Sequence, residues 1–339
     1  SKRFKMKITN INSIKLNGAY TGKKLFANEI FRGLKAKKKT ISSKYFYDDA
    51  GSKLFQKISL HKDYYPTRKE IEILNKNKFS LPKIINKTEI DIIELGPGDG
   101  SKSKIIIDGF LDSNYKVNYY PIDISKQALN FLKNKIKSTK NLYLHGIDGE
   151  YISGLKFLKN NTKNSKLVLF LGSNIGNFKK QQSKMFLKNI KKNINLNDFL
   201  LMGFDLKKSI KILTKAYNDS DNLTKKFNLN LLKRINNELN GNFKLNRFDH
   251  NGIYNPTLGA MESYIISKEN QKVHIKNLNY TFEFKVSEPI HVEYSFKFSK
   301  EDIRNLCLKT GFTSVKNFYD SKNYFMDALW CYKSNSSAL

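Results

Sequence analysis

Short apolar runs alternate with amphipathic stretches over the middle of the chain, between residues 90 and 204. Apolar runs bounded by Gly or Asp are typical of buried strands, whereas apolar residues that recur every three or four positions predict helices. Strands are expected at residues 90–95, 117–123, 142–147, 167–171 and 199–204, and helices are expected to begin near residues 101, 125 and 180. Such alternation implies a parallel sheet with helices on both faces, and ligands then bind beyond the carboxyl ends of the strands.

The pattern changes after residue 206. Helical periodicity continues at 210–217 and 223–239, and residues 261–266 and 273–284 then alternate between apolar and polar side chains, as antiparallel strands do. Further helices are expected at 24–34, 69–78 and 300–309, and further strands at 290–298, 315–319 and 328–332. The pattern predicts an insertion with its own layer, followed by a return to an antiparallel edge of the first sheet.

Glycines occupy every second position in Gly96-Pro97-Gly98-Asp99-Gly100, directly after the first expected strand. Glycine lets the backbone turn sharply and lets a ligand approach closely, while the first amides of the following helix point toward that ligand. Asp123 ends the next strand, where a carboxylate accepts hydrogen bonds from ribose hydroxyls. The two features together predict a site for a nucleotide-like cofactor.

Two further patterns have a structural explanation as well as a functional one. Asp148 and Gly149 end the third expected strand, where they either contact an adenine amino group or form a plain turn. Tyrosines are dense at 45–47 and 64–65, next to Asp, Gly and Pro residues that signal turns. Because each buried phenol needs a hydrogen-bond partner, these tyrosines either pack under a loop or line a binding pocket.

Composition narrows the class of protein. Hydrophobic residues make up 40% of the 339 residues, which is enough for one large core or two smaller ones. Cys307, Cys331 and the five histidines lack metal-site spacing, so no metal is expected, and the cysteines are expected to be buried thiols in a reducing compartment. No apolar run approaches the ~20 residues of a membrane span, and we expect a cytoplasmic protein without a membrane partner.

The net charge of +31 raises the question of a nucleic-acid partner, because surface cations release counterions from phosphate backbones. Only six of the 61 basic residues are Arg, however, and the Lys residues are scattered evenly along the chain. Nucleic-acid binders depend on Arg for bidentate contacts. A solvated lysine surface is therefore favoured, and nucleic acid is not an expected partner.

Seven short sequence motifs follow one another along the chain. They are Tyr-Phe-Tyr-Asp-x-x-Gly-Ser at 45–52, Tyr-Tyr-Pro-Thr-Arg at 64–68, Glu-Leu-Gly-x-Gly at 94–98, Phe-Leu-Gly-Ser-x-Ile-Gly-Asn at 170–177, Ala-Tyr-Asn-Asp at 216–219, Phe-Asn-x-Asn at 227–230 and Glu-Tyr-Ser-Phe-Lys-Phe at 293–298. The third is similar to the first motif of class I S-adenosylmethionine methyltransferases, so S-adenosylmethionine is the expected cofactor. Together the motifs resemble the L-histidine Nα-methyltransferases of ergothioneine biosynthesis, which make trimethylhistidine from histidine.

The resemblance implies a role for particular residues. Those that would bind S-adenosylmethionine are Gly96, Lys102, Asp123, Asp148 and Gly149, and those that would bind the amino acid are Tyr47, Tyr64, Asn177, Tyr217, Glu293 and Ser295. Asn177 and Tyr217 would hold the substrate carboxylate, and Glu293 with Ser295 would hold the imidazole. The last two are two residues apart on an expected strand and therefore face the same side. No catalytic acid or base is expected, since positioning an unprotonated amine in line with the methyl group can supply much of the rate.

The resemblance also implies the architecture: an α/β fold whose class I methyltransferase sheet is Rossmann-like and mostly parallel, with a second α+β domain for the substrate. Residues 1–72 would form the first part of the substrate-binding domain and 207–292 the inserted rest of it. Residues 73–206 would form the methyltransferase domain, to which 293–339 return. We expect a monomer that acts on a small free amino acid.

Three alternatives stay open. Glu262-Ser263 stands where the family pattern often has Glu-Met, so another amino acid can be the substrate. The charge is compatible with an RNA methyltransferase, although Gly172-Ser173-Asn174 replaces the Asp/Asn-Pro-Pro-aromatic motif of nucleic-acid amino methyltransferases. The net charge is also compatible with a non-catalytic protein that binds nucleic acid and uses the methyltransferase fold only as a scaffold. Separately, Glu293 and Ser295 have a structural interpretation, in which the pair takes part in a surface salt bridge with one of the many lysines.

Overall fold

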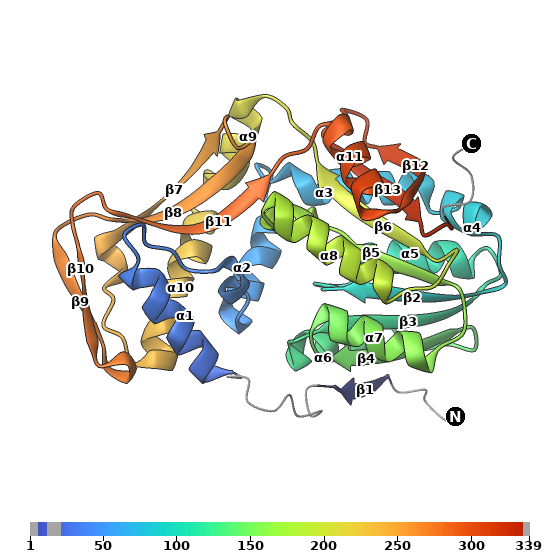
Figure 1. Cartoon of the computed structure of the whole chain (residues 1–339), viewed down its shortest axis with the longest axis horizontal. Helices are drawn as coiled ribbons and strands as arrows, with labels where there is room; N and C mark the ends of the chain where they lie inside the picture. Colours follow the sequence, from blue (N-terminus) through green and yellow to red (C-terminus); the bar gives the residue numbers. More distant parts are fainter. Residues whose placement is uncertain (1–5, 12–21, 335–339) are drawn as a thin grey trace. The chain divides into compact units, whose positions relative to one another are not determined.

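The computed structural model describes residues 6–11 and 22–334, which divide into two units (Figure 1). Unit 1 contains the described residues up to 11 together with 69–206 and 298–334, and unit 2 contains 22–68 and 207–297. The chain thus passes from unit 1 to unit 2 between the described residues 11 and 22, and it passes between the units again after residues 68, 206 and 297. The resemblance instead implies boundaries after 72, 206 and 292, with all of residues 1–72 in the substrate-binding domain. Among the described residues, no helix is long and apolar enough to cross a membrane.

Unit 1 is built on an eight-stranded sheet, counted over the described part of the chain, in the order β1-β4-β3-β2-β5-β6-β13-β12. Its strands are β1 (Lys7–Asn10), β2 (Glu89–Leu95), β3 (Lys116–Asp123), β4 (Leu142–Asp148), β5 (Lys166–Phe170), β6 (Phe199–Asp205), β12 (Thr313–Tyr319) and β13 (Phe325–Cys331). Strands β1 to β6 pair in parallel, and β13 runs antiparallel to both β6 and β12. The predicted mostly parallel, Rossmann-like class I methyltransferase sheet is confirmed.

Helices cover both faces of this sheet (Figure 1). Along β5, Val168 and Phe170 belong to one apolar core, whereas Leu167 and Leu169 belong to the other, because successive strand residues point to opposite faces. The first core includes residues of α7 (Tyr151–Asn161), α8 (Lys180–Lys192) and α11 (Lys300–Thr310), and the second includes residues of α3 (Tyr65–Asn77), α4 (Ser80–Ile85), α5 (Ser101–Leu111) and α6 (Lys126–Lys135).

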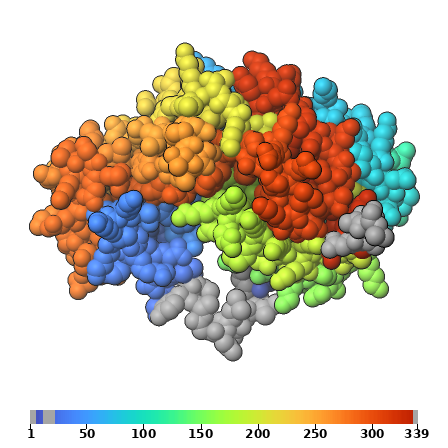
Figure 2. Space-filling model, turned by 45° about the horizontal axis from the view of Figure 1, so that its top comes forward, coloured from blue at the N-terminus to red at the C-terminus, as the bar shows by residue number. Residues whose placement is uncertain are grey.

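Unit 2 combines helices with antiparallel strands around a third core. Its helices are α1 (Lys23–Lys35), α2 (Asp49–Leu60), α9 (Ile210–Tyr217) and α10 (Leu223–Leu239), and its strands are β7 (Phe248–Asn255), β8 (Ala260–Ser267), β9 (Gln271–Ile275), β10 (Tyr280–Phe284) and β11 (Pro289–Phe296). Three strands form a sheet in the order β11-β8-β7, and β9 pairs with β10. Figure 2 shows α1 in blue beside the orange β9–β10 hairpin, where Phe31 meets Tyr280 edge to face at 5.3 Å.

Several elements differ from the expectation. Residues 49–60, whose turn signals indicate a loop, form helix α2, because Asp48 caps it by accepting a hydrogen bond from the amide of Gly51 at 2.7 Å. Strand β1 and helix α7 were not predicted. The segment expected at 273–284 is a hairpin of two strands, β9 and β10, that meet across a short turn.

Candidate functional site

The glycine segment joins β2 to α5 in unit 1. Gly96, Gly98 and Gly100 have φ angles of +72°, +58° and +73°, a left-handed region that other residues rarely adopt. A Cβ atom on Gly96 would lie 2.5 Å from the hydroxyl oxygen of Tyr151 on α7. Both the conformation and the close approach therefore require glycine at position 96.

A buried carboxylate fixes the strand beneath this loop to the helix that follows it. Glu94, near the end of β2, accepts hydrogen bonds from the hydroxyls of Ser103 on α5 and Tyr119 on β3. Burial raises the pKa of Glu94. Since Glu94 is only 2% exposed, its contacts serve the geometry of the loop rather than a ligand.

Lys102 occupies the first turn of α5 and pairs with a carboxylate that the sequence did not reveal. Its Nζ lies 2.7 Å from Oε2 of Glu70, which also accepts the amide N–H of Gly172 at 2.9 Å. Burial alone would lower the pKa of Lys102, but the charge and the hydrogen bond of Glu70, together with the charges of Glu94 and Asp327, outweigh burial and raise that pKa. Glu70 is fully buried and links α5 to the loop after β5. In the sequence, Glu70 is surrounded by charged residues, a pattern that predicts an exposed helix face rather than a buried carboxylate.

The carboxyl ends of β2, β3 and β4 meet beside the glycine loop. Asp123 and Asp148 are register partners on β3 and β4, and the amide of Gly149 donates to the carbonyl of Asp123 at 3.0 Å. The amide of Gly96 donates to the carbonyl of Ile122 at 3.0 Å. Burial, together with the charge of Asp148, raises the pKa of Asp123 to about 6. The structure thus brings four of the five expected cofactor residues to one edge of the sheet, and Lys102 follows in the adjoining helix.

Asn177 ends the short 3-10 helix η2 (Asn174–Asn177) in the loop that follows β5 in unit 1. Ser173, just before η2, has φ +56° and accepts the amide N–H of Asp205 through its hydroxyl at 2.8 Å. This bond ties the loop to the end of β6. Asn177 is partly buried, at the same sheet edge where β5 ends.

In unit 2, β11 presents Glu293 and Ser295 on one face, as the sequence predicted. The hydroxyl of Tyr217, the last residue of α9, donates to Oγ of Ser295 at 2.6 Å. Nζ of Lys297 donates to both of these oxygens at 2.9 Å. Burial raises the pKa of Glu293 to about 7, although the charge of Lys297 opposes that rise. Tyr217, Ser295 and Lys297 therefore form one buried polar group, with Glu293 on the same strand face.

Strand β8 contributes the next residue to this face. Ser263 is the register partner of Glu293 and also of Gly252 on β7. It is 1% exposed, so its hydroxyl lies inside unit 2 rather than at the surface. The residue that departs from the family pattern is therefore directly opposite the expected imidazole ligand.

Tyr47 and Tyr64 gather around a shared aromatic side chain. The ring of Phe55 on α2 meets Tyr47 at 5.6 Å and Tyr64 at 6.1 Å, both edge to face. Phe227 on α10 packs against the same group, with its ring centre 5.8 Å from that of Phe55 and its ring plane tilted by 44°. Tyr47 remains 42% exposed, which leaves much of its surface for a ligand or solvent.

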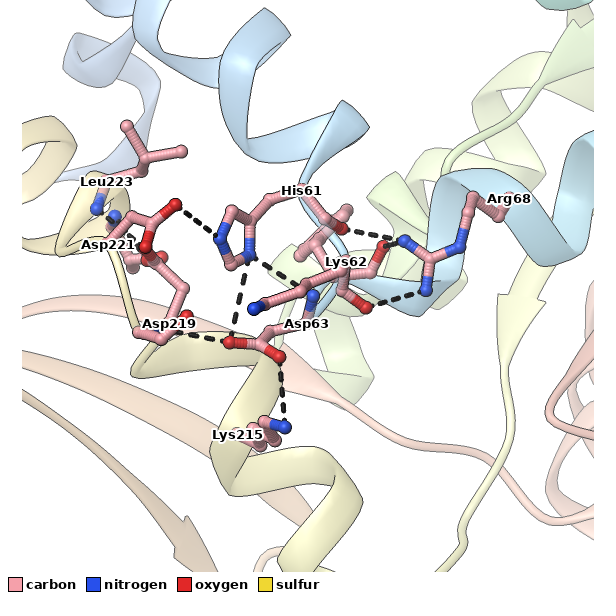
Figure 3. A network of polar contacts seen from close by, with 11 residues as sticks. His61, Lys62, Asp63, Arg68, Lys215, Asp219, Asp221 and Leu223 are labelled. Atoms are coloured by element: carbon pink, nitrogen blue, oxygen red, sulfur yellow. Dashed lines mark hydrogen bonds and ion pairs between the residues drawn. The ribbon is translucent and has the colours of Figure 1, made fainter.

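A polar network fixes the loop that carries Tyr64 (Figure 3). The guanidinium of Arg68 donates to the carbonyls of His61 at 2.7 Å, Lys62 at 2.8 Å and Tyr64 at 3.1 Å. Nδ1 of His61 accepts the amide N–H of Asp63 at 3.1 Å. The guanidinium of Arg68 and the imidazole of His61 thereby fix the conformation of this loop.

The same network ties this loop to the turn between α9 and α10 (Figure 3). Asp63 accepts the amide N–H of Ser220 at 3.0 Å and pairs with Lys215 at 3.1 Å. Asp219 caps α10 by accepting the amides of Leu223 and Thr224, each at 2.7 Å. Because Tyr217 lies between Lys215 and Asp219, the network fixes the ends of two segments that carry expected substrate residues.

Comparison with known proteins places the chain in a family. Residues 26–332 match the family described as histidine-specific methyltransferases, SAM-dependent. The chain belongs to this family. It is 30% identical to the histidine N-alpha-methyltransferase of Mycolicibacterium smegmatis over 81% of the chain and 85% of that protein. It is 27% identical to the Mycobacterium tuberculosis protein of the same name, over 91% and 95%. It is 30% identical to ergothioneine biosynthesis protein 1 of Schizosaccharomyces pombe, over 82% of the chain and 37% of that protein.

The carboxyl edge of unit 1 fits the cofactor of this family of S-adenosylmethionine-dependent methyltransferases. A Cβ on Gly98 would have no neighbour within 4 Å, so the loop faces open space there, and α5 begins directly after Gly100. Asp123 supplies a carboxylate for hydroxyl donors at the end of β3. A ligand with a ribose and a polar tail meets suitable groups there.

Asp63 gives the methyltransferase a measurable dependence of stability on pH. Burial tends to raise the pKa of Asp63, but hydrogen bonds from Ser220 and the pairing with Lys215 outweigh it and lower the pKa to about 2. A carboxylate whose pKa is lowered in the folded state stabilises the fold at pH values above 3.8, its pKa in the unfolded chain. This stabilisation is lost as the pH falls toward 2. We expect Asp63→Asn to cost about 1 to 2 kcal/mol at neutral pH.

Thermal unfolding at several pH values checks this expectation. The difference in Tm between wild type and Asp63→Asn should shrink between about pH 4 and pH 2. Asp221→Asn is the matched control, because this partner of His61 is 66% exposed and should change the Tm little. Equal destabilisation by both variants, or a difference that persists at pH 2, would contradict the role of Asp63.

Proposed function

We propose that the chain transfers methyl groups from S-adenosylmethionine to the α-amino nitrogen of L-histidine, which is the first step of ergothioneine biosynthesis. The observation that carries the proposal is the shared face of Glu293 and Ser295 beside Tyr217. A neutral imidazole has one N–H donor and one nitrogen acceptor, and a carboxylate next to a hydroxyl complements both. The names of the mycobacterial relatives and of the family support the same substrate.

Each expected residue has a place in this proposal. Gly96 and the α5 N-terminus accommodate the cofactor tail beside Lys102, while Asp123 accepts from the ribose hydroxyls and Asp148 with Gly149 contacts the adenine. Glu293 accepts the ring N–H, and Ser295 serves the other ring nitrogen. The remaining substrate residues, which contact the aliphatic part and the carboxylate of the amino acid, are Tyr47, Tyr64, Asn177 and Tyr217.

The chemistry needs orientation more than activation. Bound S-adenosylmethionine supplies an electrophilic methyl group, so the protein has only to present an unprotonated amine in line with it. The α-amino pKa of about 8 leaves a neutral fraction of the substrate near neutral pH. Glu293 rejects apolar side chains, since a buried carboxylate without a hydrogen-bond partner is costly.

Ser263 favours a second candidate, the N-methylation of a different amino acid. Its hydroxyl faces the position of Glu293 across the β8–β11 pair, where it adds a polar group to the ring pocket. Relatives of the chain include the N-methyltransferase imqF of Aspergillus flavus, 25% identical over 88% of the chain. Ser263 can therefore accept a side chain with an additional polar atom.

The test is a methylation assay with S-adenosylmethionine and each free amino acid, read by mass spectrometry. Histidine should gain up to three methyl groups and should be the preferred amino acid. A preference for another amino acid would select the second candidate, and methylation of RNA alone would refute both. No histidine product under conditions in which the cofactor binds would contradict the first proposal.

We also propose that the enzyme works as a cytoplasmic monomer on a small free substrate. Cys307 and Cys331 are free and buried, in agreement with a reducing compartment. Sedimentation of the purified chain with and without S-adenosylmethionine would test the monomer.

A further inference from the structure

Lys297 lies immediately after β11 and is almost entirely buried, with 3% of its surface exposed. Its Nζ donates to the hydroxyl oxygens of Tyr217 and Ser295, each at 2.9 Å, and lies 4.8 Å from the centre of the Tyr217 ring. The backbone N–H of Lys297 donates to the carbonyl of Gly259 at 2.9 Å, which extends the strand pairing beyond β11. The side chain is thereby held on the same face as Glu293 and Ser295.

The directions of these hydrogen bonds restrict what Ser295 can do. An ammonium group has three donors and no acceptor, so Ser295 Oγ must accept from Lys297. Oγ also accepts from the hydroxyl of Tyr217 at 2.6 Å. A hydroxyl oxygen has two lone pairs, and these two bonds use both of them. The hydroxyl proton of Ser295 must then point away from Lys297 and Tyr217.

Charge supports the same arrangement. Burial raises the pKa of Glu293 and would favour its neutral form, whereas the charge of Lys297 acts in the opposite direction. Buried charges in proteins are rarely left without a counter-charge. A cation four residues along the strand therefore helps Glu293 to remain a carboxylate, which can only accept hydrogen bonds.

We propose that Lys297 is a positioning residue that makes Ser295 a hydrogen-bond donor and Glu293 an acceptor toward the ring of the substrate. One donor and one acceptor on the same strand face match the two nitrogens of a neutral imidazole. This inference rests on the proposed function, because it explains how that pocket would select histidine. It assigns Lys297 no direct contact with the substrate.

The experiment compares histidine with an analogue whose five-membered ring keeps the N–H but has carbon in place of the second nitrogen, a pyrrolylalanine. The wild-type enzyme should prefer histidine in kcat/KM by about tenfold to a hundredfold, since the analogue leaves the Ser295 donor without an acceptor. Lys297→Met keeps the length of the side chain but removes its donors and charge. This variant should raise the KM for histidine and reduce the preference to within about threefold.

Controls separate a positioning role from a structural one. The Kd for S-adenosylmethionine, measured by calorimetry on each variant, should stay within about twofold of wild type, because neither Lys297 nor Ser295 is among the residues expected to bind the cofactor. Lys297→Arg retains charge and donors and should recover most of the preference for histidine. Lys276→Met, at an exposed position of unit 2, is the matched control and should leave both kcat and KM unchanged.

Ser295→Ala keeps the proposal testable if Lys297→Met does not fold. It should abolish the preference for histidine over the analogue. Where Lys297→Met does fold, adding it to Ser295→Ala should reduce that preference no further. An unchanged preference in either single variant would overturn the role of Lys297 while leaving histidine methylation intact. Absence of histidine methylation by the wild type would overturn the proposed function, and the role of Lys297 with it.

Discussion

Replacement of Glu293 by Gln should lower kcat/KM for histidine about a hundredfold, because the ring N–H loses a charged acceptor. The Kd for S-adenosylmethionine should stay within about twofold of wild type, since Glu293 is not among the residues expected to bind the cofactor. Steady-state kinetics and calorimetry measure the two quantities. Glu283→Gln is the matched control, because Glu283 on β10 is a carboxylate of the same unit that is 70% exposed.

The pH dependence of the loss in kcat/KM shows whether the ionised carboxylate of Glu293 causes it. Burial places the pKa of Glu293 near 7, so the wild type gains its acceptor only as the pH rises through about 7. The ratio of wild-type to Glu293→Gln activity should therefore grow between about pH 6 and pH 8. Taking the ratio cancels the titration of the substrate itself, which both enzymes share. A constant ratio over this range, or an equal loss of cofactor affinity, would contradict the assigned role.

Replacement of Asp123 by Ala should weaken S-adenosylmethionine binding about tenfold to a hundredfold, because hydrogen bonds to a carboxylate are stronger than those to a neutral acceptor. Calorimetry with S-adenosylmethionine alone measures this without turnover. The pKa of Asp123 is raised to about 6 by burial, with Asp148 adding to the effect, so the wild-type Kd should increase as the pH falls below 6.

Asp112→Ala is the control for this prediction, because Asp112 is an exposed carboxylate of unit 1 at the end of α5. It should bind the cofactor like wild type over the whole pH range. Wild-type affinity in Asp123→Ala would remove Asp123 from the cofactor site, and an equal loss in both variants would indicate a general electrostatic effect.

Local patterns predicted the sheet because its strands are short apolar runs bounded by turn residues. The glycine loop and Asp123 were found in the same way, since each follows a strand directly in sequence. Strand β1 escaped prediction because Lys7–Asn10 is short and lies at the sheet edge, where pairing with β4 decides its structure. Helix α2 escaped because the Asp48 cap and the aromatic contacts of Phe55 outweigh the turn signals around it.

Residues that position other site residues, and are not themselves expected to contact a ligand, were the hardest to predict from the sequence. Glu70 is recognisable only once the fold places it between Lys102 and Gly172, which are far apart in the sequence. Lys297 could have been found from the sequence, because Glu293, Ser295 and Lys297 alternate along the strand expected at 290–298 and would therefore share a face. The motifs assigned only Tyr217, Glu293 and Ser295 to this part of the site, whereas the buried ammonium of Lys297 donates to Ser295 there.

Strands β12 and β13 of the unit 1 sheet follow the unit 2 segment 207–297 in sequence, and this order has a consequence for biosynthesis. A ribosome releases β6 long before β13, because the whole of residues 207–297 must be made between them. Until then β6 presents an open edge of unpaired amides and carbonyls, which is prone to adhere to other nascent chains. This edge stays open until residues 325–331 have been translated, so we expect the demand for chaperones to last from the translation of β6 to that of β13.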